Sequence, residues 1–198
     1  MSTKSNNQNQ LYPVFLKLDK LNMLIVGAGE VGYEKLSFIL KSSPNANITV
    51  VATWISKDVQ SLLNGGGFDV HVQEKSFETE DIFGHDIVVA ATDDHELNLQ
   101  IHAAAKSQGK IVNVADTPNL CDFYMGSIVT RGDLKVAIST NGKSPTFAKR
   151  FRQLLEEILP QDTQELINNL KNIRDRLTGG FSQKVKKLNA LTASLIEN

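Results

Sequence analysis

Three glycines form the clearest chemical motif of this chain. Gly27, Gly29 and Gly32 make a G-x-G-x-x-G sequence directly after the apolar run NMLIV and before a segment with helical periodicity. The first glycine allows a sharp turn, the second lets the backbone approach a pyrophosphate, and the third lets helix and strand pack closely. Free N–H groups at the helix N-terminus would face the pyrophosphate. The motif predicts a dinucleotide-binding loop, with a structural turn as the alternative.

The residues expected to determine the preference for NAD or NADP give a weaker indication than the glycine motif does. The second predicted strand ends VVATWIS, so no Asp or Glu stands where a carboxylate would hold the ribose diol of NAD. No Arg stands there to favour the 2′-phosphate of NADP, although Lys57 lies nearby. Hydroxyl and backbone contacts from Thr53 and Trp54 would have to serve. The choice between the two dinucleotides therefore stays open at this point.

Two more strand ends carry polar groups. The fourth predicted strand ends AATDD, and Rossmann-type sheets bind ligands beyond the carboxyl ends of their strands, so we expect Ala91, Thr92 and Asp93 to line the nicotinamide-ribose side. Alternatively, Asp93 or Asp94 caps the next helix. The fifth strand ends NVADTPN, which puts Asp116 at the same edge, near the reacting end of the cofactor. Its alternative role is that of a turn residue.

No other arrangement of reactive side chains competes with this one. Cys121 is the one cysteine, which rules out an internal disulfide and a multi-cysteine metal site and fits a reducing cytoplasm. The four histidines, His71, His85, His95 and His102, lack convincing metal-ligand spacing. We expect structural or surface roles for them and no bound metal.

The composition is that of a soluble globular protein. It is 41% hydrophobic and 22% charged, with a net charge of −1, which gives no reason to expect nucleic-acid binding. The start MSTKSNNQNQ is polar, and no apolar run approaches the ~20 residues of a membrane span. We expect a cytoplasmic protein without a leader or a membrane anchor.

Strand and helix patterns alternate through the first part of the chain. Helical periodicity is seen at Glu30–Ser43, Ser56–Asn64 and His95–Gly109, with Ser56 as an N-cap and Gly109 as a C-cap. The predicted strands are Tyr12–Leu18, Asn22–Ala28, Asn47–Thr53, Gly67–Gln73, Asp86–Thr92 and Ile111–Asp116. This alternation with short links predicts an α/β fold with a Rossmann-type parallel sheet covered on both faces.

The pattern changes after the sheet. Asp122–Thr140 predicts a β-hairpin, whose apolar face (Phe123, Ile128, Val136, Ile138) needs a partner surface, most simply a second copy of the chain. Ser144-Pro145 then opens a helical region. We divide the chain into a disordered tail (1–11), an NAD-binding Rossmann domain (12–118), a dimerisation region (119–143) and a helical C-terminal domain (144–198).

Several motifs together resemble one family. In order they are YPVFLKL, LIVGAGEVGYEK, VVAATDD, VNVADTP, FYMGSIVTRGDLKVAIST and NGKSPTFAKRFR. They are similar to the precorrin-2 dehydrogenase family, which includes the N-terminal part of siroheme synthases. The resemblance runs from about Tyr12 to Leu159. Many Rossmann proteins share the glycine loop, but few follow it with these later segments in this order.

The resemblance implies NAD-dependent oxidation of precorrin-2 to sirohydrochlorin in siroheme biosynthesis. It places NAD contacts on Glu30 and Val31 and on the pair Thr53 and Trp54, which accounts for the missing acid. It matches the functionally required aspartate of the family with Asp116. It also implies that the hairpin forms a homodimer, and it matches Ser144 with a serine that is phosphorylated in some members.

A polycarboxylate substrate would need cationic contacts and helix N–H groups. We expect these at Lys143, Ser144, Lys149 and Arg150, with Arg152 as a further candidate; each basic residue could instead be a solvated surface charge. Some family members also insert iron, whereas others leave this to a separate chelatase. The alternatives are thus a bifunctional ferrochelatase and, from another class, a non-catalytic NAD(H)-sensing module.

Overall fold

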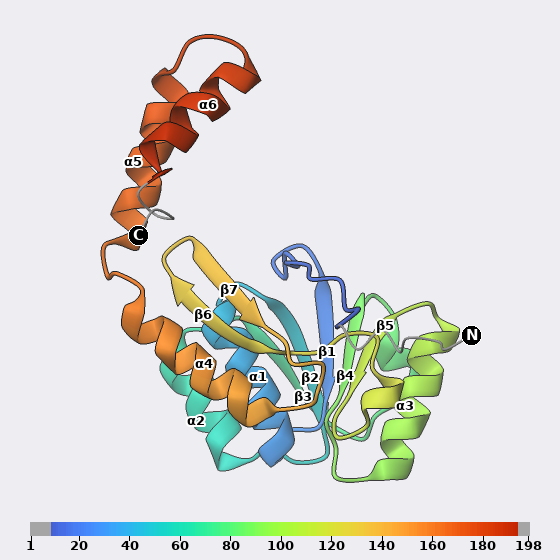
Figure 1. The fold of residues 1–198 in the computed structure, drawn as a ribbon. Coiled ribbons are helices and arrows are strands. Elements are labelled where there is room, and N and C mark those ends of the chain that lie inside the picture. The colour runs from blue at the N-terminus through green and yellow to red at the C-terminus, as the bar shows by residue number, and fades with distance from the viewer. Residues whose placement is uncertain (1–8, 194–198) are drawn as a thin grey trace, which may run out of the picture. The chain divides into compact units, whose positions relative to one another are not determined.

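The structure is a computed structural model that describes residues 9–193 (Figure 1). Most of the predicted disordered tail, 1–11, lies outside the described residues, and residues 9–11 have no regular structure. The chain divides into two compact units, Met1–Met125 and Gly126–Asn198. Each unit is described by itself.

The first unit contains a five-stranded, all-parallel sheet in the order β3-β2-β1-β4-β5. Its strands are β1 (Asn22–Val26), β2 (Asn47–Ala52), β3 (Val70–Glu74), β4 (Ile87–Ala90) and β5 (Ile111–Val114). The helices between them are α1 (Glu30–Ser42), α2 (Lys57–Gly66) and α3 (His95–Ser107), with short 3-10 turns η1 (Thr79–Ile82) and η2 (Pro118–Leu120). This order is that of a Rossmann sheet, and it confirms the predicted fold class.

Helices cover both faces of the sheet because its strands carry apolar side chains on both sides. Met23 and Ile25 face the core that packs against α1 and α2, whereas Leu24 and Val26 face the core that packs against α3 and η1. Figure 1 shows α1 and α2 on one side of the sheet and α3 on the other. The sheet is thus rigidly held, with its carboxyl edge left open to loops.

The helix ends follow the predicted local chemistry with one adjustment. The hydroxyl of Ser56 accepts a hydrogen bond from Val59 N at 3.3 Å, which confirms the predicted N-cap of α2. Gly109 does not itself cap α3; Gln108 does, and Gly109 follows with φ +69°. A left-handed residue one position beyond the cap is the usual way to leave a helix.

The predicted strand at Tyr12–Leu18 is wrong. This segment has no strand structure, and Tyr12 and Phe15 are 87% and 68% exposed. Its alternating side chains fit a strand pattern, but a strand also needs a neighbour for its N–H and C=O groups. Within the described unit, only the end of the segment is tied to the sheet region, where Asn47 N donates to Leu18 O at 3.0 Å.

The second unit begins with the predicted hairpin, in which β6 (Ser127–Arg131) pairs antiparallel with β7 (Leu134–Ile138). The predicted apolar face is wrong in part. Val129 pairs with Val136 on one face, whereas Ile128 pairs with Ala137 on the other. Val129 is the buried member, at 1% exposed, and β6 packs against the following helix. Phe123 belongs to the core of the first unit.

Three helices complete the second unit: α4 (Pro145–Ile158), α5 (Thr163–Arg176) and α6 (Phe181–Leu191). The N-cap predicted for α4 is confirmed, because Ser144 Oγ accepts from Phe147 N at 3.2 Å with Pro145 in the first turn. Residues 194–198 of the last amphipathic segment lie outside the described residues. No helix within residues 9–193 is both long enough and apolar enough to cross a membrane.

Candidate dinucleotide and catalytic site

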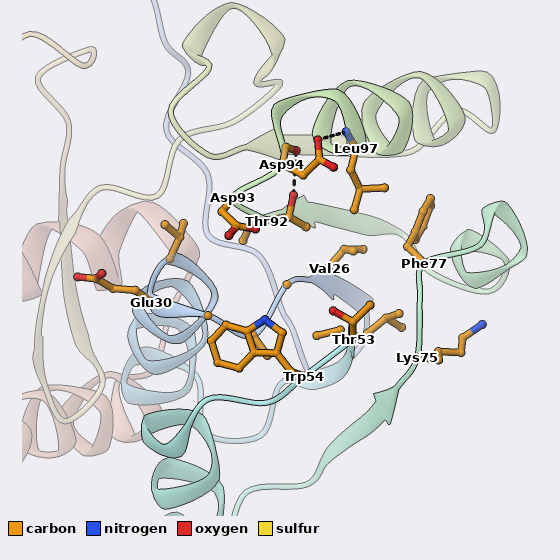
Figure 2. Close-up of a pocket in the computed structure, with 17 residues that line it drawn as sticks. Val26, Glu30, Thr53, Trp54, Lys75, Phe77, Thr92, Asp93, Asp94 and Leu97 are labelled. Carbon is orange, nitrogen blue, oxygen red and sulfur yellow. Dashed lines mark hydrogen bonds between the residues drawn. The ribbon is translucent and has the colours of Figure 1, made fainter.

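A cavity of about 540 Å³ opens at the carboxyl edge of the sheet, between the loops that follow β1 and β4. Strand order reverses between these two strands, which is where doubly wound sheets bind ligands. Figure 2 shows the lining side chains. Eight residues predicted to hold the cofactor line this cavity: Gly27, Gly29, Glu30, Val31, Thr53, Trp54, Thr92 and Asp93.

The glycine loop has the backbone geometry that a pyrophosphate site requires. Gly27 has φ +108°, and a Cβ there would collide with the carbonyl group of Ala91. Gly32 does not line the cavity; a Cβ at Gly32 would collide with Gly27 O, so this glycine lets α1 pack against the loop. Gly29 is the N-cap of α1 and supplies no side-chain cap, which leaves the first N–H groups of the helix for a ligand.

Thr53 and Trp54 follow β2 on one wall of the cavity. The Trp54 side chain is 56% exposed, and a Cβ at Gly29 would lie 3.5 Å from its ring, so the indole stands beside the glycine loop (Figure 2). Trp54 is the one tryptophan of the chain. Its emission therefore reports on this wall alone.

The opposite wall follows β4, and here the two aspartates have different roles. Asp94 is the N-cap of α3, because its Oδ1 accepts from Leu97 N at 3.0 Å. Asp93 also lines the cavity but caps no helix, and its side chain is exposed. The helix-capping role considered for Asp93 or Asp94 therefore holds for Asp94.

Asn98 is a positioning residue that the sequence analysis missed. Its side chain is 5% exposed; its Oδ1 accepts from Thr92 N at 3.2 Å, and its Nδ2 donates to Thr92 O at 2.9 Å. The hydroxyl of Thr92 also contacts Asn98 Oδ1, at 2.8 Å. A usable pattern was present, since Asn98 lies on the same helix face as Ile101 and Ala105, where a polar residue needs a partner.

The cavity also includes residues from α3 and from the segment after β3 that were not predicted. Lys75 and Phe77 come from the segment that leaves β3, and Leu97 comes from the first turn of α3. Nothing in the sequence marks them as a group, because they meet only once β3 is placed next to β2.

Asp116 lies at the carboxyl end of β5, at the same edge of the sheet, but it does not line the cavity. It is exposed and has φ +55°, a left-handed conformation that Asp tolerates better than most residues. Ala115 N donates to Ala90 O at 2.9 Å, and Thr117 N donates to Val114 O at 3.3 Å, so the chain turns sharply around Asp116. Its carboxylate has no hydrogen-bond or ion-pair partner among the described residues.

The segment after this turn folds back along β5 and holds it in place. The Cys121 thiol accepts from Val114 N at 3.3 Å, and burial raises the pKa of the thiol. Asp122 Oδ2 accepts from Val112 N at 2.9 Å and from Lys106 Nζ at 2.8 Å. The Lys106 side chain lowers the pKa of the Asp122 carboxyl. Cys121 thus has a structural role beside the Asp116 turn.

The predicted substrate contacts Lys143, Ser144, Lys149 and Arg150 belong to the second unit. The three basic residues are exposed, and Ser144 caps α4. Their assignment to a substrate stays a prediction. No group of three His, Cys, Asp or Glu side chains that could hold a metal ion occurs within residues 9–193.

A five-stranded parallel sheet, an uncapped glycine turn and a cavity at the switch point together define a dinucleotide-binding Rossmann protein. Residues 14–127 match the family described as "Putative NAD(P)-binding", and the chain belongs to this family. Residues 131–158 match the family described as "Sirohaem biosynthesis protein central".

Known relatives confirm the resemblance found in the motifs. The chain is 38% identical over 90% of its length to a siroheme synthase of Pseudoalteromonas atlantica, covering 38% of that protein. It is 36% identical over 85% of its length to a siroheme synthase of Nitrosomonas europaea, covering 35% of it. The chain thus spans little more than a third of these relatives.

A solved structure titled "SirC, precorrin-2 dehydrogenase" has the same fold. The TM-score is 0.71 at 24% identity, and the match covers 94% of this chain and 90% of that one. The shared fold includes the Rossmann sheet, the hairpin and the C-terminal helices.

Proposed function

We propose that this protein is an oxidoreductase of siroheme biosynthesis that oxidises precorrin-2 to sirohydrochlorin with NAD as the acceptor. The observation that carries the proposal is the cavity at the switch point together with Asp116 at the same edge of the sheet. The similarity to siroheme synthases over most of the chain supports the pathway. The name of the solved relative supports the substrate.

The residues of the cavity fit a nicotinamide dinucleotide. The uncapped N–H groups at the start of α1 would bind the pyrophosphate, and the close approach at Gly27 leaves it room. Thr53 and Trp54 would hold the adenosine ribose. Thr92, which Asn98 fixes in place, would hold the nicotinamide side. When bound, NAD accepts a hydride.

Asp116 is the proposed proton acceptor. Oxidation of precorrin-2 removes two hydrogens, one as a hydride and one as a proton. An exposed carboxylate without a partner can take that proton and pass it to water, or hold the macrocycle in place. Asp116 lies in a left-handed turn just after β5, and this turn sets the direction of its side chain.

We also propose that the protein works as a homodimer. Phe147, Phe151, Leu154 and Ile158 lie on one narrow stripe of α4, and each is exposed, from 39% to 60%. An apolar stripe of this kind is typical of a buried interface, and a second copy is the simplest partner.

The test is an anaerobic assay with purified protein, NAD and precorrin-2. The expected result is formation of NADH together with the absorbance of sirohydrochlorin. Binding of NAD without turnover would instead favour a non-catalytic NAD(H) sensor. A second arm supplies sirohydrochlorin and ferrous ion; no rate above the protein-free control is expected if a separate chelatase inserts the metal.

A further inference from the structure

We propose that an ion-pair cluster at the end of β3 makes the cavity select NAD over NADP. The cluster consists of Lys75, Glu78 and Asp81, and its action rests on the proposed dinucleotide site. The two cofactors differ only by a phosphate on the adenosine ribose. The residues beside that ribose therefore decide between them.

Lys75 is placed where it could meet such a phosphate. In Rossmann sheets the end of β2 faces the adenosine ribose, and here that end is Ala52 followed by Thr53 and Trp54. Lys75 N donates to Ala52 O at 2.9 Å, so the backbone of Lys75 lies directly beside this end. Within the described residues, Lys75 is the one Lys or Arg among those that line the cavity.

Two carboxylates nevertheless hold this cation. Lys75 Nζ lies 2.7 Å from Glu78 Oε2 and 2.8 Å from Asp81 Oδ1. Asp81 is itself fixed, because its Oδ2 accepts from Glu78 N at 2.9 Å as part of a capping box at η1, and its side chain is 10% exposed. Figure 2 shows the Lys75 ammonium turned away from Thr53 and Trp54.

The charge balance of this corner is consequently unfavourable for a phosphate. Lys75 contributes one positive charge, and its two partners contribute two negative charges, so the cluster carries a net charge of −1. Elsewhere in the lining, Glu30, Asp93 and Asp94 add further carboxylates. A 2′-phosphate would meet repulsion, and the one basic residue of the described lining is already ion-paired, whereas the diol of NAD has no charge and meets neither problem.

The experiment measures the affinities for NADH and NADPH through energy transfer from Trp54, the one tryptophan, which lines the same cavity. The wild-type protein is expected to bind NADH more tightly. The double variant Glu78→Gln/Asp81→Asn keeps both side-chain shapes and frees Lys75. Its affinity for NADPH is expected to rise about tenfold or more, with the NADH affinity within about twofold of wild type.

Two further variants test whether the rise in NADPH affinity is due to Lys75. Adding Lys75→Gln to the double variant should remove the gain for NADPH. Glu78→Gln alone changes an exposed side chain, leaves the Asp81 contact in place and should give a smaller gain, which covers the case of a poorly folded double variant.

The outcomes separate this inference from the proposed function. If the wild-type protein binds neither dinucleotide, both are overturned. If it binds NADH, but NADPH affinity stays unchanged in Glu78→Gln and in the double variant, only the cluster is overturned. A wild-type preference for NADPH would overturn both the cluster and the choice of NAD as the acceptor, while leaving the dehydrogenase reaction itself in place.

Discussion

The two units of this protein bury their apolar residues to different degrees. In the first, the strands β1 and β4 are almost fully buried, with Leu24, Ile25, Val88 and Val89 all at 0% exposed. In the second, Val129 and Ala148 are the buried apolar residues among those described, and the stripe on α4 remains exposed. The first unit therefore completes its own core, whereas the second does not.

This difference suggests a division of roles. A site that must hold a cofactor in a fixed geometry needs a rigid support, which the sheet supplies. A unit with a thin core and exposed aromatic residues needs a partner surface for its stability. We therefore expect the chemistry to depend on the first unit and the assembly on the second.

The largest effect is expected at Asp116. The variant Asp116→Asn keeps a residue that accepts a left-handed backbone but removes the charge and the basicity. Its kcat should fall by about 10²–10⁴, because general-base catalysis contributes this much. NADH binding, followed by Trp54 emission, should stay at the wild-type level. An undiminished kcat would remove Asp116 from the mechanism.

The second effect tests the role of α4. Phe151→Lys places a charge in the middle of the exposed stripe, next to Phe147, whose ring centroid lies 5.9 Å away. The dimer dissociation constant should rise about 30-fold or more, the size expected for an aromatic anchor of an interface. Sedimentation equilibrium measures it.

The matched control for that variant is Gln153→Lys, which adds the same charge on the opposite side of α4. It should leave the dimer unchanged. If neither variant alters the association, or if the wild-type protein is a monomer at all concentrations, the stripe is not an interface between copies.

A smaller effect is expected at Asn98. Asn98→Leu keeps the volume but leaves the Thr92 N–H and C=O without their partner, which should cost about 1–3 kcal/mol of the free energy of unfolding. NADH affinity should fall about tenfold, because Thr92 lines the cavity. Asn98→Asp keeps the oxygen acceptor and should therefore lose less unfolding free energy and less NADH affinity. Equal losses in the two variants would argue against this role of the amide.

The smallest effect concerns the Asp122–Lys106 pair. Because the Lys106 side chain lowers the pKa of Asp122, the pair stabilises the fold above the ordinary aspartate pKa of about 4, and this is lost as the pH falls through the lowered pKa. Asp122→Asn should therefore lower Tm slightly near neutral pH and flatten its acid dependence. Asp69→Asn, at an exposed position of the same unit, is the control. If Tm depended on pH in the same way in both variants, the stabilising role of the Asp122–Lys106 pair would be contradicted.

Local patterns predicted much of the fold correctly. Ser56 and Ser144 cap their helices as expected, and the five strands of the sheet overlap the segments predicted as strands. These features depend on neighbours within a few residues in the chain. The strand predicted at Tyr12–Leu18 failed because a strand needs partners for its N–H and C=O groups along its whole length, whereas this segment is tied to the described unit at its end, where Asn47 N donates to Leu18 O.

The sequence by itself determined the order of strands and helices, the glycine turn and the placement of Asp116 at a strand end, since these follow from side-chain periodicity and backbone freedom. Only the tertiary structure decided that Asn98 clamps Thr92, that Lys75 is held by two carboxylates beside β2, and that Val129 is the buried residue of the hairpin. Each of these depends on strand order, register or the packing of a helix. Local patterns were present, a polar residue on an apolar helix face and a capping box at Glu78 and Asp81, but they do not name the partners that the folded chain brings together.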